Sequence, residues 1–166
     1  RADLIVMTRV DQCPDRQKQN IVEQVQAVCP DIVCVEVGFP PEFLENAEGL
    51  RVPLSTLTGK KIAAFCGIGN PDSFHRSLLD VGYDVGSFRS FSDHHHYSSE
   101  ELDEIGEWGK QAGALAILVT QKDLVKIMRT ELIGLPVWAV RIGTRFLRGG
   151  ETLENYLQSI LNSILG

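Results

Sequence analysis

The sequence predicts a three-layer α/β fold in which helices cover both faces of a mostly parallel sheet. Short apolar segments of strand length alternate along the chain with longer amphipathic segments, which is the order found when helices connect parallel strands. Most of the strand-length segments are apolar at nearly every position, as is typical of strands buried on both faces. A chain of 166 residues can bury one hydrophobic core, so we expect residues 1–166 to form a single domain.

The first third of the chain is predicted to be a β-α-β unit followed by a connector. Residues 4–8 and 32–37 are apolar and rich in β-branched side chains, which predicts two strands. Between them, residues 14–28 carry apolar side chains at helical spacing and are followed by Pro30, so we expect a helix that ends there. Residues 38–60 contain three prolines and no regular period, and we expect an irregular connector.

The middle third predicts two further β-α units. Residues 61–66 are a continuous apolar strand, and the helix expected over 72–81 ends at Gly82. Residues 83–91 alternate between apolar and polar side chains and predict the next strand. A polar loop then leads into a helix over residues 99–112.

The last third predicts two strands and two helices. Residues 115–120 are a strongly apolar strand that leads directly into a short helix over 121–128, and residues 136–142 are the last predicted strand. In residues 152–165 the apolar side chains repeat on one helix face. We expect that face to pack on the sheet of the same domain, with a membrane or a partner as the alternatives. This order of elements is typical of Rossmann-like folds.

The composition is that of a globular protein, with 43% hydrophobic and 23% charged residues. The net charge of −6 argues against a general nucleic-acid-binding protein, because such a protein needs a basic surface, although Arg141, Arg145 and Arg148 can form a local basic patch. No apolar segment approaches the roughly 20 residues that span a bilayer. The four cysteines form no C-x-x-C pair, and we expect a cytoplasmic protein with reduced thiols. Because a strand follows Arg1 almost at once, we expect the chain to be part of a longer protein.

Residues 91–97, with the sequence Phe-Ser-Asp-His-His-His-Tyr, are the strongest functional signal in the chain. They hold three of the four histidines between a predicted strand and a predicted helix. The pKa of an unperturbed imidazole lies close to physiological pH, so a histidine cluster predicts proton transfer or metal binding. We call residues 91–97 the histidine loop.

Two other loops follow predicted strands and begin predicted helices. Ligands of open α/β sheets bind beyond the carboxyl ends of the strands, so both loops are candidate binding segments. The turn at residues 67–71 contains Gly67, Gly69 and Asn70, and it is either an anion site or a tight turn capped by Asn70. In the other loop Thr120 can cap the following helix, and Lys122 and Asp123 can pair with each other or face a phosphate and a hydroxyl. Neither segment has the G-x-x-x-x-G-K-[ST] spacing of a P-loop, and no P-loop occurs elsewhere in the chain.

Four segments together resemble, in order and approximate spacing, the C-terminal half of tetraacyldisaccharide 4'-kinase, the lipid A kinase of Gram-negative bacteria. These segments are ADLIVMTR at residues 2–9, AFCGIGNPDSF at 64–74, FSDHHHY at 91–97 and VTQKDLVK at 119–126. The resemblance implies a two-lobed enzyme at the cytoplasmic face of the inner membrane, in peripheral contact with it. Such an enzyme transfers the γ-phosphate of ATP, with Mg²⁺, to the 4'-hydroxyl of a lipid A precursor disaccharide.

The resemblance also implies which lobe this chain represents. The P-loop of the family and an aspartate thought to act as base lie in the N-terminal lobe, which is absent from these 166 residues. The chain is therefore expected to be the C-terminal lobe, to lack activity alone, and to leave most of the ATP and Mg²⁺ contacts to the missing lobe. No residue of this chain is assigned to a metal.

The resemblance further implies roles for individual residues. His94 is expected to assist the base at the sugar hydroxyl, with Asp93 orienting it and His95 as the second choice; His96 lies at a position that the family leaves variable. Lys122 and Asp123 match a T-x-E-K-D motif of the family in which Gln121 replaces the usual glutamate. The expected contacts to the cofactor come from six residues: Lys122, Asp123, Thr120, Gly67, Gly69 and Asn70.

Two alternative functions are compatible with the same residues. One is a metal-dependent phosphoesterase with Asp93, His94 and His95 as ligands, which needs further carboxylates such as Asp11 or Asp123. The other is a binding domain without catalytic activity that shares the fold.

Overall fold

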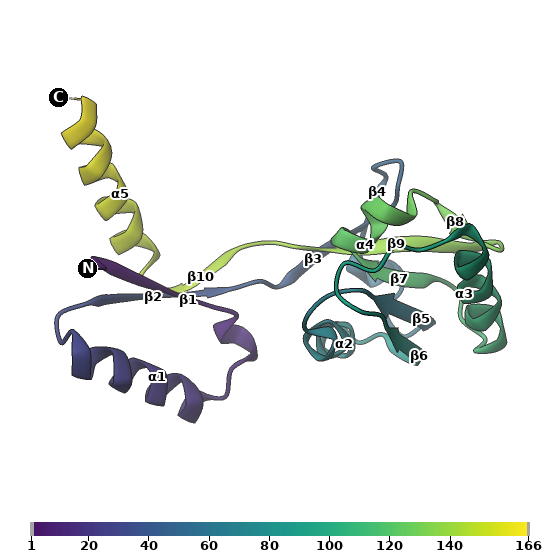
Figure 1. The fold of residues 1–166 in the computed structure, drawn as a ribbon, viewed down its shortest axis with the longest axis horizontal. Coiled ribbons are helices and arrows are strands. Elements are labelled where there is room, and N and C mark those ends of the chain that lie inside the picture. The colour runs from purple at the N-terminus through teal and green to yellow at the C-terminus, as the bar shows by residue number, and fades with distance from the viewer. Residues whose placement is uncertain (1, 166) are drawn as a thin grey trace. The chain divides into compact units, whose positions relative to one another are not determined.

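The computed structural model describes residues 2–165, and the chain folds into two compact units (Figure 1). The central unit consists of residues 41–142. The terminal unit combines the residues up to 40 with those from 143 onward. The expected single domain is thus replaced by two units, because segments near both ends of the chain pair in a small sheet of their own.

The central unit is built on a seven-stranded sheet with the strand order β4-β3-β9-β7-β5-β6, and β8 pairs with β9 off this path. Strands β9, β7, β5 and β6 run parallel to one another, and the β3–β4 hairpin adds to β9 in the antiparallel direction. The strands are β3 (Pro41–Glu45), β4 (Arg51–Pro53), β5 (Lys61–Cys66), β6 (Asp84–Ser90), β7 (Ile117–Thr120), β8 (Glu131–Leu132) and β9 (Leu135–Ile142).

Helices cover both faces of this sheet, as the sequence predicts. They are α2 (Pro71–Asp80), α3 (Ser99–Gln111) and α4 (Gln121–Ile127). Alternate residues of β5 separate two cores: Ala63 and Phe65 pack with side chains of α3 and α4, whereas Ile62 and Ala64 pack with side chains of α2. Continuous apolar strands are required here because both faces of β5 are buried.

Each helix of the central unit starts at a polar residue that caps it. The side chains of Asn70, Ser98 and Thr120 accept a hydrogen bond from the backbone N–H three residues later, at 3.1, 3.1 and 3.3 Å. These caps fix where the chain leaves the carboxyl ends of β5 and β7 and where the histidine loop enters α3.

The predicted connector at residues 38–60 is corrected by the structure, which places β3, β4 and a 3-10 turn (Leu54–Thr56) within it. Prolines do not prevent these strands because Pro41 begins β3 and Pro53 ends β4, an edge strand of the sheet.

The three arginines of the expected basic patch are divided between the units. Arg141 pairs with Glu45 at 3.3 Å in the central unit, and Arg145 and Arg148 lie in β10 of the terminal unit.

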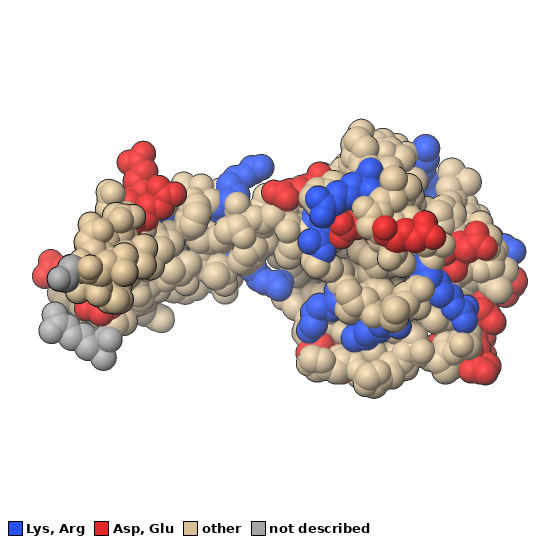
Figure 2. All heavy atoms as spheres, turned by 90° about the horizontal axis from the view of Figure 1, so that it is seen from above, with Lys and Arg blue, Asp and Glu red and all other residues tan. Residues whose placement is uncertain are grey.

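The terminal unit is a three-stranded sheet with few buried side chains. Its elements are β1 (Leu4–Thr8), a 3-10 turn (Val10–Gln12), α1 (Asp15–Val28), β2 (Val33–Gly38), β10 (Arg145–Arg148) and α5 (Gly150–Leu165), with the strand order β1-β2-β10. Neither α1 nor α5 has a buried residue, so the sheet leaves most of the apolar face of α5 uncovered, in contrast to the full packing that the sequence predicted. Leu157, Leu161 and Ile164 are each at least half exposed, and uncharged side chains predominate on the side of this unit seen in Figure 2.

Candidate active site

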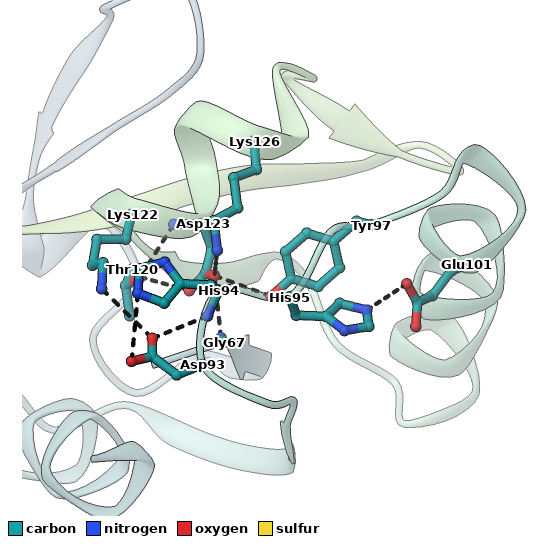
Figure 3. Close-up of polar contacts among 10 residues, drawn as sticks. All are labelled: Gly67, Asp93, His94, His95, Tyr97, Glu101, Thr120, Lys122, Asp123 and Lys126. Carbon is teal, nitrogen blue, oxygen red and sulfur yellow. Dashed lines mark hydrogen bonds and ion pairs between the residues drawn. The ribbon is translucent and has the colours of Figure 1, made fainter. Parts of the chain in front are cut away.

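Three loops of the central unit meet at one edge of its sheet. Because β6, β5 and β7 are adjacent and parallel, their carboxyl ends lie side by side. The histidine loop follows β6, and the turn at residues 67–71, which we call the glycine turn, follows β5. Thr120 joins β7 to α4. Figure 3 shows the side chains that these loops bring together. The sequence therefore predicted this meeting of the three loops correctly.

Asp93 and His94 form an exposed acid–imidazole pair. The Asp93 carboxylate accepts a hydrogen bond from the His94 backbone N–H at 3.0 Å, and its other oxygen lies 3.8 Å from Nε2 of the His94 ring. The Nζ of Lys122 lies 3.6 Å from Oδ1 of Asp93, so the carboxylate is placed between an ammonium and an imidazole. The side chains of His94 and Asp93 are 77% and 43% exposed, which leaves both accessible to reactants.

The backbone of His94 has an uncommon conformation. Its φ of +62° lies in the left-handed region, which residues other than glycine seldom occupy. Strained backbone of this kind is retained where the surrounding structure holds it, and it occurs often at functional sites. Here the conformation is held by the contact of the backbone N–H with Asp93.

His95 is turned away from this pair. Its Nε2 lies 2.7 Å from Oε2 of Glu101, and its ring stacks on Phe91 with 4.8 Å between the ring centroids. Figure 3 shows the ring directed toward Glu101, on α3, whereas Asp93, His94 and Lys122 lie together. The position of His95 fits an anchor of the loop to α3 better than the second catalytic role that the sequence suggested.

Asp123 lies at the centre of the site but not on its surface. Its side chain is fully buried and accepts hydrogen bonds from the Gly67 backbone N–H at 3.1 Å, the Tyr97 hydroxyl at 3.0 Å and the Thr120 hydroxyl at 2.5 Å. The Nζ of Lys126 is 3.7 Å from the same carboxylate and makes no hydrogen bond. Because its oxygens are engaged inside the protein, the position of Asp123 fits a structural role better than the cofactor contact that the sequence predicted.

The glycine turn serves packing and capping in this structure. A Cβ at Gly67 would lie 3.0 Å from the Tyr97 hydroxyl oxygen, so a larger residue would require the histidine loop to shift away from β5. The Gly67 N–H is used by Asp123, and a Cβ at Gly69 would be 3.6 Å from an Asp93 oxygen. A negatively charged ligand at this turn would meet the Asp93 carboxylate, which favours the tight-turn interpretation over anion binding.

The predicted metal ligands do not converge. His95 is directed toward Glu101, and Asp11 belongs to the terminal unit, where it lies against Gly38. Within residues 2–165, no group of three or more His, Cys, Asp or Glu side chains has an arrangement that could hold a metal ion. The phosphoesterase alternative therefore gains no support from the geometry.

Sequence reasoning missed two residues of the site, Glu101 and Lys126. Glu101 was identifiable from the S-x-x-E pattern of residues 98–101, which is typical of a capping box at the start of a helix. Lys126 follows Asp123 by three residues, a spacing that places two side chains on one helix face. This spacing indicates a contact between Lys126 and Asp123, whereas no pattern in the sequence indicates that Glu101 would contact His95.

Burial raises the pKa of three groups around the site and the adjoining core. The pKa of the Cys66 thiol rises from 9.0 to about 12, mainly through burial and also through the Asp123 charge. Burial likewise raises the pKa of Tyr83 from 10.0 to about 12. The pKa of Tyr97 is raised further, first by burial and then by the charge of Asp123 and the hydrogen bond to it.

These shifts predict a loss of stability in alkaline solution. Each group has a higher pKa folded than unfolded, so above pH 9 the unfolded chain releases protons that the folded chain keeps. For each group the free energy of unfolding should fall by about 1.4 kcal/mol per pH unit between its two pKa values. Urea unfolding at pH 8, 10 and 11 measures this, and Tyr83→Phe should reduce the slope above pH 10. An unfolding free energy that stays constant to pH 11 would contradict the prediction.

Residues 1–162 match the protein family described as Tetraacyldisaccharide-1-P 4'-kinase. A tetraacyldisaccharide 4'-kinase of Desulfotalea psychrophila is 45% identical over 145 residues, which cover 85% of this chain and 40% of the relative. One from an Anaeromyxobacter species is 30% identical over 162 residues, covering 97% of this chain and 43% of the relative. The chain thus spans less than half the length of these curated relatives.

A solved structure shares the fold. The crystal structure described as the "apo" form of LpxK from Aquifex aeolicus in complex with ATP superimposes with a TM-score of 0.57 at 22% sequence identity. The likeness covers 95% of this chain and 51% of that one. It confirms the α/β fold class predicted from the sequence. Within residues 2–165, no helix is both long and apolar enough to cross a membrane.

Proposed function

Because this chain belongs to the tetraacyldisaccharide-1-phosphate 4'-kinase family, we propose that it is the C-terminal part of a lipid kinase. The complete enzyme would transfer the γ-phosphate of ATP to the 4'-hydroxyl of tetraacyldisaccharide 1-phosphate, a precursor of lipid A. In this proposal a preceding lobe carries the P-loop, and this chain supplies the histidine loop. We call this chain joined to that lobe the two-lobe protein.

The observation that carries the proposal is the exposed cluster of Asp93, His94 and Lys122. The Asp93 carboxylate lies within 4 Å of both the Lys122 ammonium and the His94 imidazole, at the edge where α/β proteins bind ligands. Phosphoryl transfer needs little more than positioned charge and a group that accepts a proton, and this cluster offers both.

The chemistry can be assigned to individual side chains. The sugar hydroxyl oxygen forms a bond to the γ-phosphorus while the bond from that phosphorus to the β–γ bridging oxygen breaks, and ADP leaves. The hydroxyl proton passes to the His94 imidazole, directly or on its way to a carboxylate base of the preceding lobe. Asp93 orients the ring and stabilises the imidazolium. The 3.8 Å between them is too long for a hydrogen bond, and we expect it to shorten when the reactants bind.

Lys122 is the residue of this chain best placed to contact ATP. Its ammonium lies at the exposed edge beside Asp93 and can balance charge on a transferring phosphate. Asp93, which lies beside it, offers a partly exposed carboxylate toward Mg²⁺. One lysine and one carboxylate fit the rim of a nucleotide site, and the phosphate cradle and most Mg²⁺ ligands belong to the preceding lobe.

The exposed apolar surface of the terminal unit supports the presence of a preceding lobe that covers it. Strand β1 lies at the edge of its sheet, and the apolar face of α5 is largely exposed. Apolar surface of this extent is costly in water, and a covering lobe would remove it from solvent. We therefore propose that the preceding lobe packs on the terminal unit.

The acyl chains of the substrate place the reaction at a membrane surface. We propose that the enzyme works on the cytoplasmic side of the inner membrane in peripheral contact with it, because its acceptor is a lipid. The net charge of −6 means that the overall charge of this chain does not favour binding to anionic lipids.

Product analysis tests the proposed function. The two-lobe protein is incubated with Mg²⁺, γ-labelled ATP and tetraacyldisaccharide 1-phosphate in detergent micelles, and the lipid product is analysed by mass spectrometry. We expect one added phosphate, located at the 4' position. Label in inorganic phosphate alone, with no labelled lipid, would contradict the kinase assignment and favour a hydrolase.

A further inference from the structure

The buried carboxylate of Asp123 joins all three loops of the site. Its hydrogen bonds reach Gly67 in the glycine turn, Tyr97 in the histidine loop and Thr120 at the start of α4. Gly67 and Tyr97 lie 56 and 26 residues from Asp123 in the sequence, so these bonds hold together segments that local structure does not connect.

A buried charge with three donors is a strong local constraint. Hydrogen bonds to an ionised group are stronger than bonds between neutral groups, and breaking one inside a protein leaves a charge without a partner. The Tyr97 ring adds packing to this constraint, because it makes edge contacts with Phe65 at 5.3 Å and Phe91 at 5.4 Å between ring centroids. The carboxyl-terminal end of the histidine loop is thereby fixed to the sheet.

Asp123 also positions Lys122, the third member of the cluster with Asp93 and His94. Asp123 follows Lys122 in the first turn of α4, and its bonds to Thr120 and Gly67 fix that turn against β5 and β7. Lys122 reaches Asp93 from this turn. Asp123 therefore holds both the loop that carries His94 and the helix end that carries Lys122.

We infer that Asp123 and Tyr97 are positioning residues that set the distance between the Asp93–His94 pair and Lys122. They do so through the hydrogen bond from the Tyr97 hydroxyl to the Asp123 carboxylate. The inference rests on the proposed function for its consequence in catalysis, and on the contacts alone for its consequence in structure.

Tyr97→Phe is the sharpest test because it removes one hydroxyl and keeps the aromatic packing. Tyr83→Phe is its matched control: the Tyr83 hydroxyl also donates one hydrogen bond at 3.0 Å, to the Leu54 carbonyl, and lies outside the site. Asp123→Asn is a second variant that keeps the shape of the side chain and removes its charge.

Hydrogen–deuterium exchange on the full chain reports the structural part of the inference. In Tyr97→Phe and Asp123→Asn, amide exchange of residues 91–97 should accelerate about tenfold or more. Exchange in α3 should be unchanged, and Tyr83→Phe should leave the histidine loop as it is. Unchanged exchange of residues 91–97 in both variants would overturn the inference, whatever activity the protein has.

Kinetics of the two-lobe protein report the catalytic part. Tyr97→Phe should lower kcat on the order of tenfold to a hundredfold, with the KM for ATP nearly unchanged, because misplaced groups slow the chemical step. Tyr83→Phe should keep the unmodified kcat even if it loses as much stability. Equal kcat in the two tyrosine variants would overturn the positioning role. Absence of kinase activity in the unmodified protein would refute the proposed function and leave the exchange result standing.

Discussion

Replacing His94 with alanine is expected to reduce kcat of the two-lobe protein by about 10²- to 10⁴-fold, the usual contribution of a positioned proton acceptor. The KM for ATP should change little, because in this account the His94 ring acts on the sugar hydroxyl. Stability should also change little, since the His94 side chain is 77% exposed. Initial rates with the purified lipid acceptor, combined with urea unfolding, measure both quantities.

His96 provides the matched control for this substitution. It is an exposed histidine two residues further along the same loop, so His96→Ala removes an imidazole of the same kind without touching the pair. We expect His96→Ala to retain near-normal kcat. Full activity in His94→Ala, or equal losses in the two variants, would show that the assignment of His94 is wrong.

Removal of the preceding lobe is expected to abolish product formation. The 166-residue chain contains no G-x-x-x-x-G-K-[ST] segment, and the described site offers one exposed lysine to a triphosphate. Since phosphoryl transfer depends on positioned cations around the phosphates, the chain alone lacks most of what the reaction needs. The product assay with equal concentrations of the chain and of the two-lobe protein measures the difference.

Amide exchange in the terminal unit should also differ between the chain alone and the two-lobe protein. Because α1 and α5 have no buried residue in this chain, their amides should exchange rapidly in the chain alone and slowly in the two-lobe protein. Phosphorylation of the lipid by the isolated chain would contradict the proposed division of labour. Equal exchange of α5 in both proteins would contradict packing of the lobe on this unit.

The central parallel sheet could be predicted because its strands are buried on both faces. β5 was predicted with the boundaries that it has, Lys61–Cys66, since burial on two faces requires an unbroken apolar run. Two edge strands, β4 and β10, were missed for the opposite reason. β4 has three residues and ends at Pro53, and all four residues of β10 are exposed, so neither has an apolar pattern.

The division into two units could not be predicted from local pattern. The helical period of α5 indicates an apolar face but not what covers it. The pairing of β10 with β2 joins residues more than a hundred positions apart, such as Arg145 and Gly38. Periodicity within a window of residues does not report such a contact.

The candidate site was predicted in outline and corrected in one central residue. Parallel topology alone implies that the loops after β5, β6 and β7 meet, which is why the sequence placed Asp93, His94 and Lys122 at one edge. Burial of Asp123 depends on Tyr97, which comes from a different loop. An aspartate early in a helix has the same sequence signature whether it faces solvent or the core, so its role became clear only from the contacts.

The most direct test of the central claim is the distance from the His94 ring to the acceptor hydroxyl. It can be measured in a crystal structure of the two-lobe protein with a non-hydrolysable ATP analogue and the disaccharide acceptor. The account predicts that an imidazole nitrogen lies about 2.6–3.2 Å from the 4'-oxygen, or reaches it through one water molecule. A ring that points to bulk solvent, with the 4'-hydroxyl bound beyond the reach of both His94 and Asp93, would contradict it.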